Sequence, residues 1–221
     1  MTRTVTAARA AGVIGVLALV LAGCGGGGAE PGVSRSPSSV ASTRGEADAE
    51  AAKTLPARWW SWAAAAPKDQ NPIADATGKF CARNQPDDVF FLAGTFGEED
   101  VFRKCTIPAG TPVYFPVVNR VCPLDPGESP EAAVKDCRIL NRTLLWATLN
   151  EEPLAFAEAS SKGSFRLEPV PGNDLGMAAG DAVAWGVWVG PLKLDPGIHV
   201  LEITADTKDL AINVSYGLDV L

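Results

Sequence analysis

The residues of this chain best suited to nucleophilic or metal chemistry are its five cysteines and its single histidine, His199. Cys24 stands alone at the end of an apolar run, and the four that lie much later are Cys81, Cys105, Cys122 and Cys137. No two of these later cysteines have the C-x₂₋₄-C spacing of a zinc knuckle, so we expect no metal centre. In an exported chain, an even number of cysteines favours disulfide bonds instead.

Four cysteines allow three disulfide pairings, and we favour the one that joins neighbours in the sequence. This pairing links Cys81 to Cys105 and Cys122 to Cys137. Each bond closes a loop of modest length, which contributes about 3 kcal/mol to stability on the chain-entropy model.

No recognised catalytic motif occurs in the sequence, because G-x-S-x-G, S-x-x-K, H-E-x-x-H and the P-loop are all absent. A serine triad or a cysteine–histidine dyad would have to use His199. The strand-like stretch "GIHVLEITA" places that residue on the face shared with Leu201 and Ile203, which is typical of the rim of a core. We therefore predict no catalytic histidine and no cofactor.

Carboxylate chemistry stays open as an alternative. The acids of "PDDV" and "GEED", with Asp174 or Asp181, could supply the two facing carboxyls of a glycosidase. Asp125, Glu128 and Glu131 of "DPGESPE" offer oxygen ligands for calcium, but their spacing does not match an EF-hand. In an acidic protein such loop residues are more often a solvated surface, and this is the reading that we favour.

The aromatic residues suggest a binding site. In "AVAWGVWVG", Trp185 shares a face with three valines, whereas Trp188 falls on the other face with Ala184 and Gly186. A tryptophan over small neighbours could form a platform for a sugar ring or a proline-rich peptide. The alternative is that a helix packs there, such as the one containing Trp59 and Trp62, because small residues permit close approach.

These residues must be positioned by a β-rich domain. "LPARWWSWAAAAP" predicts a helix that ends before Pro67, and "SPEAAVKDCRIL" predicts a second helix with Ala133, Cys137 and Leu140 on one side. From Thr143 onward, short β-rich runs alternate with turns such as 150–152 and "LDPG". Residues 210–220 alternate strictly between apolar and small or polar side chains. The pattern predicts a mainly β fold, an antiparallel β-sandwich (jelly-roll or Ig-like) with one or two helices.

The amino terminus predicts export and anchoring. Arg3 and Arg9 precede an uncharged run over residues 10–23, which is too short for a membrane-spanning helix. "LAGC", Leu21 to Cys24, resembles the lipobox of bacterial lipoproteins, in which the cysteine is lipidated and becomes the new N-terminus. This resemblance implies a signal peptide over 1–23, lipidation of Cys24, a low-complexity tether over 24–53 and one domain over 54–221.

The later part of the chain also resembles a known group. "FLAGTFG", "RKCTIPAGTPVYFPVVN" and "LDPGIHVLEI…INVSYGLDV" are similar to segments of an uncharacterised family of secreted bacterial β-rich proteins. Its members share a WFLAGT-like strand, a C-T-(V/I)-P-A-G turn and a PPGEHTI-like final hairpin, although this chain has "DPGIH" in place of "PGEH". The resemblance extends loosely over Trp59 to Val220, supports the β-rich fold and implies no activity.

A chain beginning at Cys24 carries 17 basic and 26 acidic side chains, a net charge of −9. Such a chain has no electrostatic footprint for nucleic acid, and only its lipid would hold it at a membrane. We therefore predict a lipid-anchored protein on the extracytoplasmic face of the cell membrane, a non-catalytic binding module for an envelope saccharide or protein. The alternatives are a carboxylate-dependent glycan hydrolase and a structural envelope lipoprotein.

Overall fold

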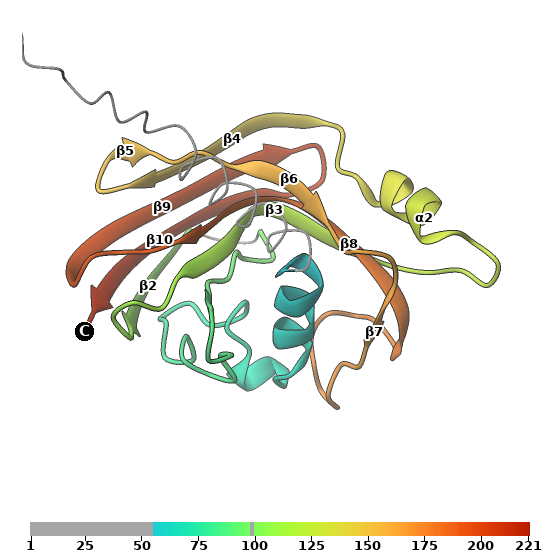
Figure 1. The fold of residues 1–221 in the computed structure, drawn as a ribbon, viewed down its shortest axis with the longest axis horizontal. Helices are drawn as coiled ribbons and strands as arrows, with labels where there is room; N and C mark the ends of the chain where they lie inside the picture. Colours follow the sequence, from blue (N-terminus) through green and yellow to red (C-terminus); the bar gives the residue numbers. More distant parts are fainter. Residues whose placement is uncertain (1–54, 98–99) are drawn as a thin grey trace, which may run out of the picture. The chain divides into compact units, whose positions relative to one another are not determined.

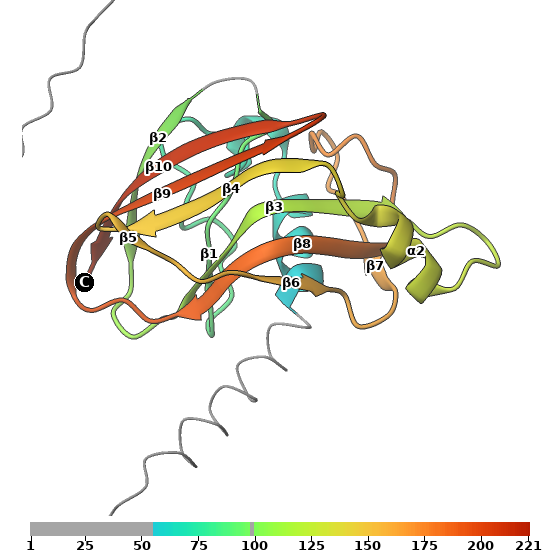
Figure 2. The same ribbon diagram turned by 90° about the horizontal axis from the view of Figure 1, so that it is seen from above.

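The computed structural model describes residues 55–97 and 100–221. The predicted signal peptide, Cys24 and nearly all of the tether lie outside these described residues. Two β-sheets pack face to face, and a helix over residues 55–64 covers the outer face of one of them (Figures 1 and 2). The predicted β-sandwich with two helices is thereby confirmed.

Sheet one has the strand order β1-β3-β8-β6, with β7 also paired to β8. Its strands are β1 (Phe90–Phe91), β3 (Val113–Pro123), β6 (Ala157–Ser160), β7 (Phe165–Leu167) and β8 (Gly180–Leu192). The helix lies against the outside of this sheet and is followed by the short 3₁₀ helix η1 (Lys68–Gln70). The helix ends before Pro67, as the sequence predicts.

Sheet two has the order β2-β10-β9-β4-β5. Its strands are β2 (Val101–Ile107), β4 (Arg142–Leu149), β5 (Glu152–Pro153), β9 (Gly197–Thr207) and β10 (Ala211–Val220). Asn150 and Glu151, which join β4 to β5, both have positive φ, as a tight hairpin turn requires. The predicted alternation is seen in β10, where Ile212, Val214 and every second residue after them are buried.

Both sheets are mixed rather than purely antiparallel. β1 pairs with β3 in parallel, and β2 pairs with β10 in parallel over seven residues, while the remaining pairings are antiparallel. In each parallel pair the chain passes through the other sheet between the two strands. β2 of sheet two lies between β1 and β3 in the chain, and strands of sheet one lie between β2 and β10.

The second predicted helix, α2 (Pro130–Cys137), projects from one end of the sandwich (Figure 1). Ser129 caps it by accepting a hydrogen bond from the amide of Ala132, and Pro130 opens its first turn. Ala133 and Cys137 are buried as expected. Leu140 is not on their face, because the helix ends at Cys137 and leaves this side chain 71 % exposed.

Two hydrophobic cores result from this layering. The larger core lies between the sheets and includes Phe115, Trp185 and Ile203. The smaller core lies between sheet one and the helix, where Trp59, Trp62 and their neighbours pack. β8 belongs to both cores, so side chains on both of its faces are buried from Ala182 to Val189.

Candidate functional site

Trp188 is not an exposed platform. Its side chain is only 3 % exposed, its ring stacks on Tyr114 with centroids 5.0 Å apart, and Trp59 of the helix meets it edge-on at 5.8 Å. The indole N–H donates to the carbonyl oxygen of Ala159. The binding site proposed for Trp188 from the sequence is therefore wrong, and the helix packing weighed against it is what the structure contains.

His199 lies at the rim of sheet two and has structural partners. One ring nitrogen lies 3.0 Å from the amide of Asn150 in the β4–β5 turn, and the other lies 2.8 Å from the carbonyl oxygen of Asp195. Both nitrogens are thus used to fix two turns.

Three of the acids considered for glycosidase chemistry have separate partners, whereas Glu98 and Glu99 of "GEED" lie outside the described residues. Asp88 forms an ion pair with Arg58 of the helix, Asp174 lies 3.1 Å from Lys68, and Asp181 lies 3.8 Å from Arg166. The hydrogen bond from Arg58 holds the pKa of Asp88 below its ordinary value, against a smaller opposing effect of burial. A general acid needs a raised pKa, so the lowered pKa of Asp88 makes it unsuited to that role.

The candidate calcium ligands do not assemble either. Glu128 accepts a hydrogen bond from the amide of Asp125, and Glu131 lies in the first turn of α2. In residues 55–97 and 100–221, no three His, Cys, Asp or Glu side chains are grouped so that they could hold a metal ion.

The four later cysteines are joined as Cys81–Cys105 and Cys122–Cys137, the pairing favoured from the sequence. Their Cα atoms lie 5.8 Å and 5.9 Å apart, within the usual range for disulfides. The first bond ties the loop before β1 to β2, and the second ties α2 to the end of β3.

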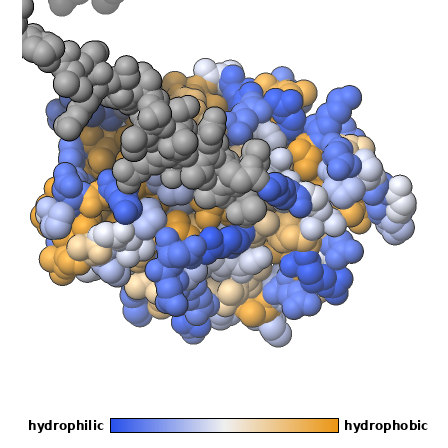
Figure 3. All heavy atoms as spheres, in the orientation of Figure 1, coloured by the Kyte–Doolittle hydropathy of each residue, from blue (hydrophilic) through white to orange (hydrophobic). Residues whose placement is uncertain are grey.

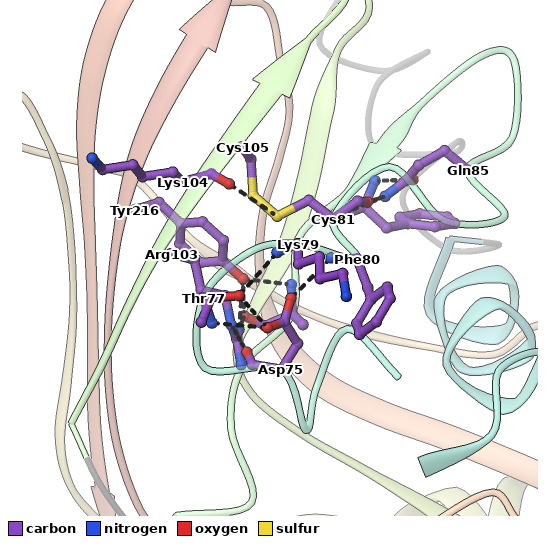
Figure 4. Close-up of a disulfide and its surroundings, with 12 residues drawn as sticks. Asp75, Thr77, Lys79, Phe80, Cys81, Gln85, Arg103, Lys104, Cys105 and Tyr216 are labelled. Carbon is purple, nitrogen blue, oxygen red and sulfur yellow. Dashed lines mark hydrogen bonds between the residues drawn. A yellow bond between two sulfur atoms is a disulfide. The ribbon is translucent and has the colours of Figure 1, made fainter. Parts of the chain in front are cut away.

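Next to the first disulfide, a buried arginine organises the loop over residues 73–81 (Figure 4). Arg103 is 1 % exposed. Its guanidinium donates hydrogen bonds of 2.6–2.9 Å to the hydroxyl of Tyr216 and to the carbonyl oxygens of Ile73, Asp75, Ala93 and Gly94. Gly78 has φ +88° and lies so close to β2 that a Cβ there would be 2.3 Å from the carbonyl oxygen of Lys104. All three guanidinium nitrogens of Arg103 donate to acceptors within the protein, so we assign this cluster a structural role.

The outer face of sheet two offers a more accessible site. Two large aromatic side chains emerge from it, Phe102 on β2, which is 55 % exposed, and Trp146 on β4, which is 47 % exposed. We call this surface the Phe102–Trp146 face and define it by these two rings and by the outward residues of β9 and β10 beside them, which are Val200, Glu202, Thr204, Asn213, Ser215 and Gly217.

Strand register fixes the spacing of the two rings. Phe102 aligns with Ser215, which aligns with Glu202 on β9. Trp146 aligns with Thr204, two residues further along β9. Three inter-strand steps of about 4.8 Å and two residues of about 3.3 Å place the two Cα atoms about 16 Å apart.

The ring of Phe102 extends over β10 beside Gly217. A Cβ at this glycine would lie 3.5 Å from Cζ of the phenylalanine, which is an ordinary van der Waals distance. Between the rings, Thr204 and Ser215 present hydroxyl groups, and Asn213 presents an amide whose nitrogen donates to Asp100 and whose oxygen can accept. The face therefore combines two exposed aromatic rings with hydrogen-bonding side chains.

The charges on this surface are mainly negative. Among the outward positions of β2, β9 and β10, Lys104 is basic, whereas Glu202, Asp206 and Asp219 are acidic. On the side of the molecule seen in Figure 3, the visible hydrophobic residues are interspersed with hydrophilic ones. A ligand for this face should therefore be uncharged or cationic rather than anionic.

Sequence reasoning missed Phe102 and Trp146. Phe102 could have been found, because it stands an odd number of residues from Cys105 in one strand and must face away from that disulfide-bonded side chain. Trp146 lies in the apolar run "TLLWATL", which gives no alternation from which to choose a face.

Comparison with known proteins provides no family assignment, because no protein-family model matches the chain and no curated protein or solved structure is significantly similar to it. None of the helices in the described part of the chain is long and apolar enough to cross a bilayer.

Proposed function

We propose that this protein is a lipid-anchored, extracytoplasmic binding module that recognises a neutral saccharide through the Phe102–Trp146 face, without catalysing a reaction. The observation that carries the proposal is the pair of half-exposed aromatic rings, Phe102 and Trp146, on one sheet face about 16 Å apart. Lipidation of Cys24 would hold the module at the membrane, and the tether would give it reach.

The chemistry of the face suits a sugar chain. A pyranose has a C–H face that can lie on an aromatic ring and a hydroxyl edge that needs hydrogen-bond partners. Phe102 and Trp146 supply the rings, and the side chains between them supply donors and acceptors. A purely apolar protein partner would leave those hydroxyl and amide groups buried without partners, at a cost of about 1–3 kcal/mol each.

Charge narrows the choice of saccharide. The carboxylates on β9 and β10 make this face locally negative within a chain whose net charge is −7, and both repel polyanions such as nucleic acids and acidic polysaccharides. We therefore commit to neutral glycans.

The test is calorimetric titration of the full-length protein with a neutral β-glucan, α-glucan and mannan, and with polygalacturonate as the anionic comparison. Trp146→Ala and Phe102→Ala should each weaken binding of a neutral glycan about tenfold, the loss of one aromatic contact worth about 1.4 kcal/mol. Leu140→Ala removes a still more exposed apolar side chain away from the face and should leave affinity unchanged. Preference for polygalacturonate, or full affinity in both aromatic variants, would contradict the proposal.

An assay for glycan hydrolysis distinguishes the proposed binding function from the hydrolase alternative. Incubation of the protein with the glycan that it binds should release no new reducing ends. Mass spectrometry of the native protein should find a diacyl group on Cys24 at the mature amino terminus, and a free thiol there would remove the anchoring part of the proposal.

A further inference from the structure

The strand register of sheet two sets a regular path between the two exposed rings. From Phe102 to Trp146 the path crosses β10 and β9, so it takes three steps between neighbouring strands. It also moves two residues along the strands, and the total of about 16 Å is therefore divided into three diagonal steps of about 5.3 Å. Each of the four strands then offers one contact position along the path.

The two inner positions carry hydroxyl groups that a ligand can use. Ser215 on β10 and Thr204 on β9 are the outward residues closest to the line that joins the rings. Both residues are partly exposed, and neither hydroxyl has a hydrogen-bond partner among the described residues. Glu202 and Asn213, which flank them, already have side-chain partners. A ring, two hydroxyls and a second ring therefore follow one another at nearly equal spacing.

We propose that the Phe102–Trp146 face binds four consecutive sugar units of an extended, neutral β-(1→4)-linked glycan, with one unit over each of the strands β2, β10, β9 and β4. This inference rests on the proposed function and adds the linkage and the length of the ligand. A pyranose joined through two equatorial oxygens advances an extended chain by about the same distance as the diagonal step of about 5.3 Å. The outer units would stack on the rings, and the inner units would bond to Ser215 and Thr204.

The twist of the sheet selects a single glycan chain over a flat glycan surface. Adjacent strands of a sheet are rotated by about 20–25°, so three steps rotate β4 relative to β2 by about 60–75°. Rings on these two strands cannot both lie against a planar, crystalline glycan, whereas a free chain can turn at each glycosidic bond. A chain linked through an axial oxygen, as in α-(1→4)-glucan, curves away from this path and cannot contact both rings.

The experiment is calorimetric titration of the full-length protein with β-(1→4)-linked gluco- and manno-oligosaccharides, from the disaccharide to the hexasaccharide. In whichever series binds, affinity should rise about tenfold from the trisaccharide to the tetrasaccharide, because only the tetrasaccharide reaches the second ring. Affinity should change little for longer chains. The α-(1→4)-linked series should show no such step, and crystalline β-(1→4)-glucan should not retain the protein when it is sedimented.

Variants test which residues set the length. Trp146→Ala removes the second ring, so the trisaccharide and the tetrasaccharide should bind with affinities within about twofold of each other. Leu144→Trp combined with Trp146→Ala moves the ring two residues along β4, to a Cα separation of about 20 Å, and should shift the step to the pentasaccharide. Leu140→Trp combined with Trp146→Ala is the matched control and should restore no step, because Leu140 lies away from the face. Thr204→Val should weaken the tetrasaccharide about threefold to tenfold without moving the step.

A step at another length, a step that Leu144→Trp does not move, or the same step with α-(1→4)-linked sugars would overturn this inference, as would retention on the crystalline glycan. Each of these results would leave the proposed function standing, because glycan binding is still observed. Absence of any glycan binding by the wild type would instead refute the proposed function, and this inference with it. If the variant with Leu144→Trp fails to fold by circular dichroism, the comparison of Trp146→Ala with the wild type decides.

Discussion

The buried arginine gives the sharpest test of how the fold is held together. The perturbation is Arg103→Met, which preserves much of the side-chain volume and removes every donor. It leaves four backbone carbonyl oxygens and the hydroxyl of Tyr216 without the guanidinium. These groups belong to the loop before β1, to residues 93–94 and to β10, so one substitution loosens three segments.

The magnitude follows from those contacts. Each buried polar group left unpaired costs about 1–3 kcal/mol, but a simple sum would approach the whole stability of a typical domain, about 5–15 kcal/mol. Rearrangement and entry of water reduce the loss, and we expect about 4 kcal/mol, a large loss of the kind that follows when a buried hydrogen-bond network is broken. Tyr216→Phe should cost about 2 kcal/mol, because it leaves the amide of Ala93 without its acceptor.

The assay is urea denaturation of the full-length protein at pH 7, followed by far-UV circular dichroism. Arg166→Met is the control, because its ion pairs with Glu168 and Asp181 are exposed and contribute little. The double variant of Arg103 and Tyr216 should lose less than the two single losses combined, since the two side chains share a hydrogen bond. A loss below about 1 kcal/mol in Arg103→Met, equal to that of the control, would refute the reasoning.

Two further predictions concern the pH dependence of stability and the layer beneath the helix. Burial alone would raise the pKa of Asp75, but hydrogen bonds from Phe80 and Thr77 and the charge of Arg103 outweigh it and lower the pKa below its ordinary value of 3.8. Asp75→Asn should therefore reduce the free energy of unfolding at pH 7, and the difference from the wild type should shrink as the pH falls below about 3.8. Denaturation at pH 7 and at pH 3 measures this difference. A difference that grows in acid would contradict the lowered pKa of Asp75. Trp188→Ala should cost about 3–5 kcal/mol of stability while leaving glycan affinity intact, and the reverse result would restore Trp188 as a binding residue.

Local signals in the sequence were enough to predict many of the elements. Pro67 marks the end of the first helix, Ser129 and Pro130 mark the start of the second, and the turn after Asn150 joins two strands. Each depends on the conformational limits of one or two residues. The strict alternation over residues 210–220 likewise identifies both faces of β10.

Long-range pairings had no comparable signal. Nothing within β2 or β10 indicates that these strands lie side by side in parallel, because that pairing depends on the path of the whole chain between them. The same limit explains Trp188. The two-residue alternation of a strand places Trp188 on the face opposite Trp185. Whether that face is covered depends on a helix more than 120 positions earlier in the chain.

The two sheets differ in what their outer faces can tolerate, and this difference determines where a ligand can bind. The outward side chains of β8 are small or aromatic, such as Ala182, Ala184 and Trp188, so a tryptophan-rich helix packs on them through mainly apolar contacts. The outward side chains of β9 and β10 include Thr204, Asn213 and other hydrogen-bonding groups. An apolar cover there would bury donors and acceptors without partners, and an open apolar surface would attract unwanted neighbours. A face that carries both rings and hydrogen-bonding groups is satisfied by water or by a ligand with the same mixture, which is the physical reason for assigning saccharide binding to sheet two.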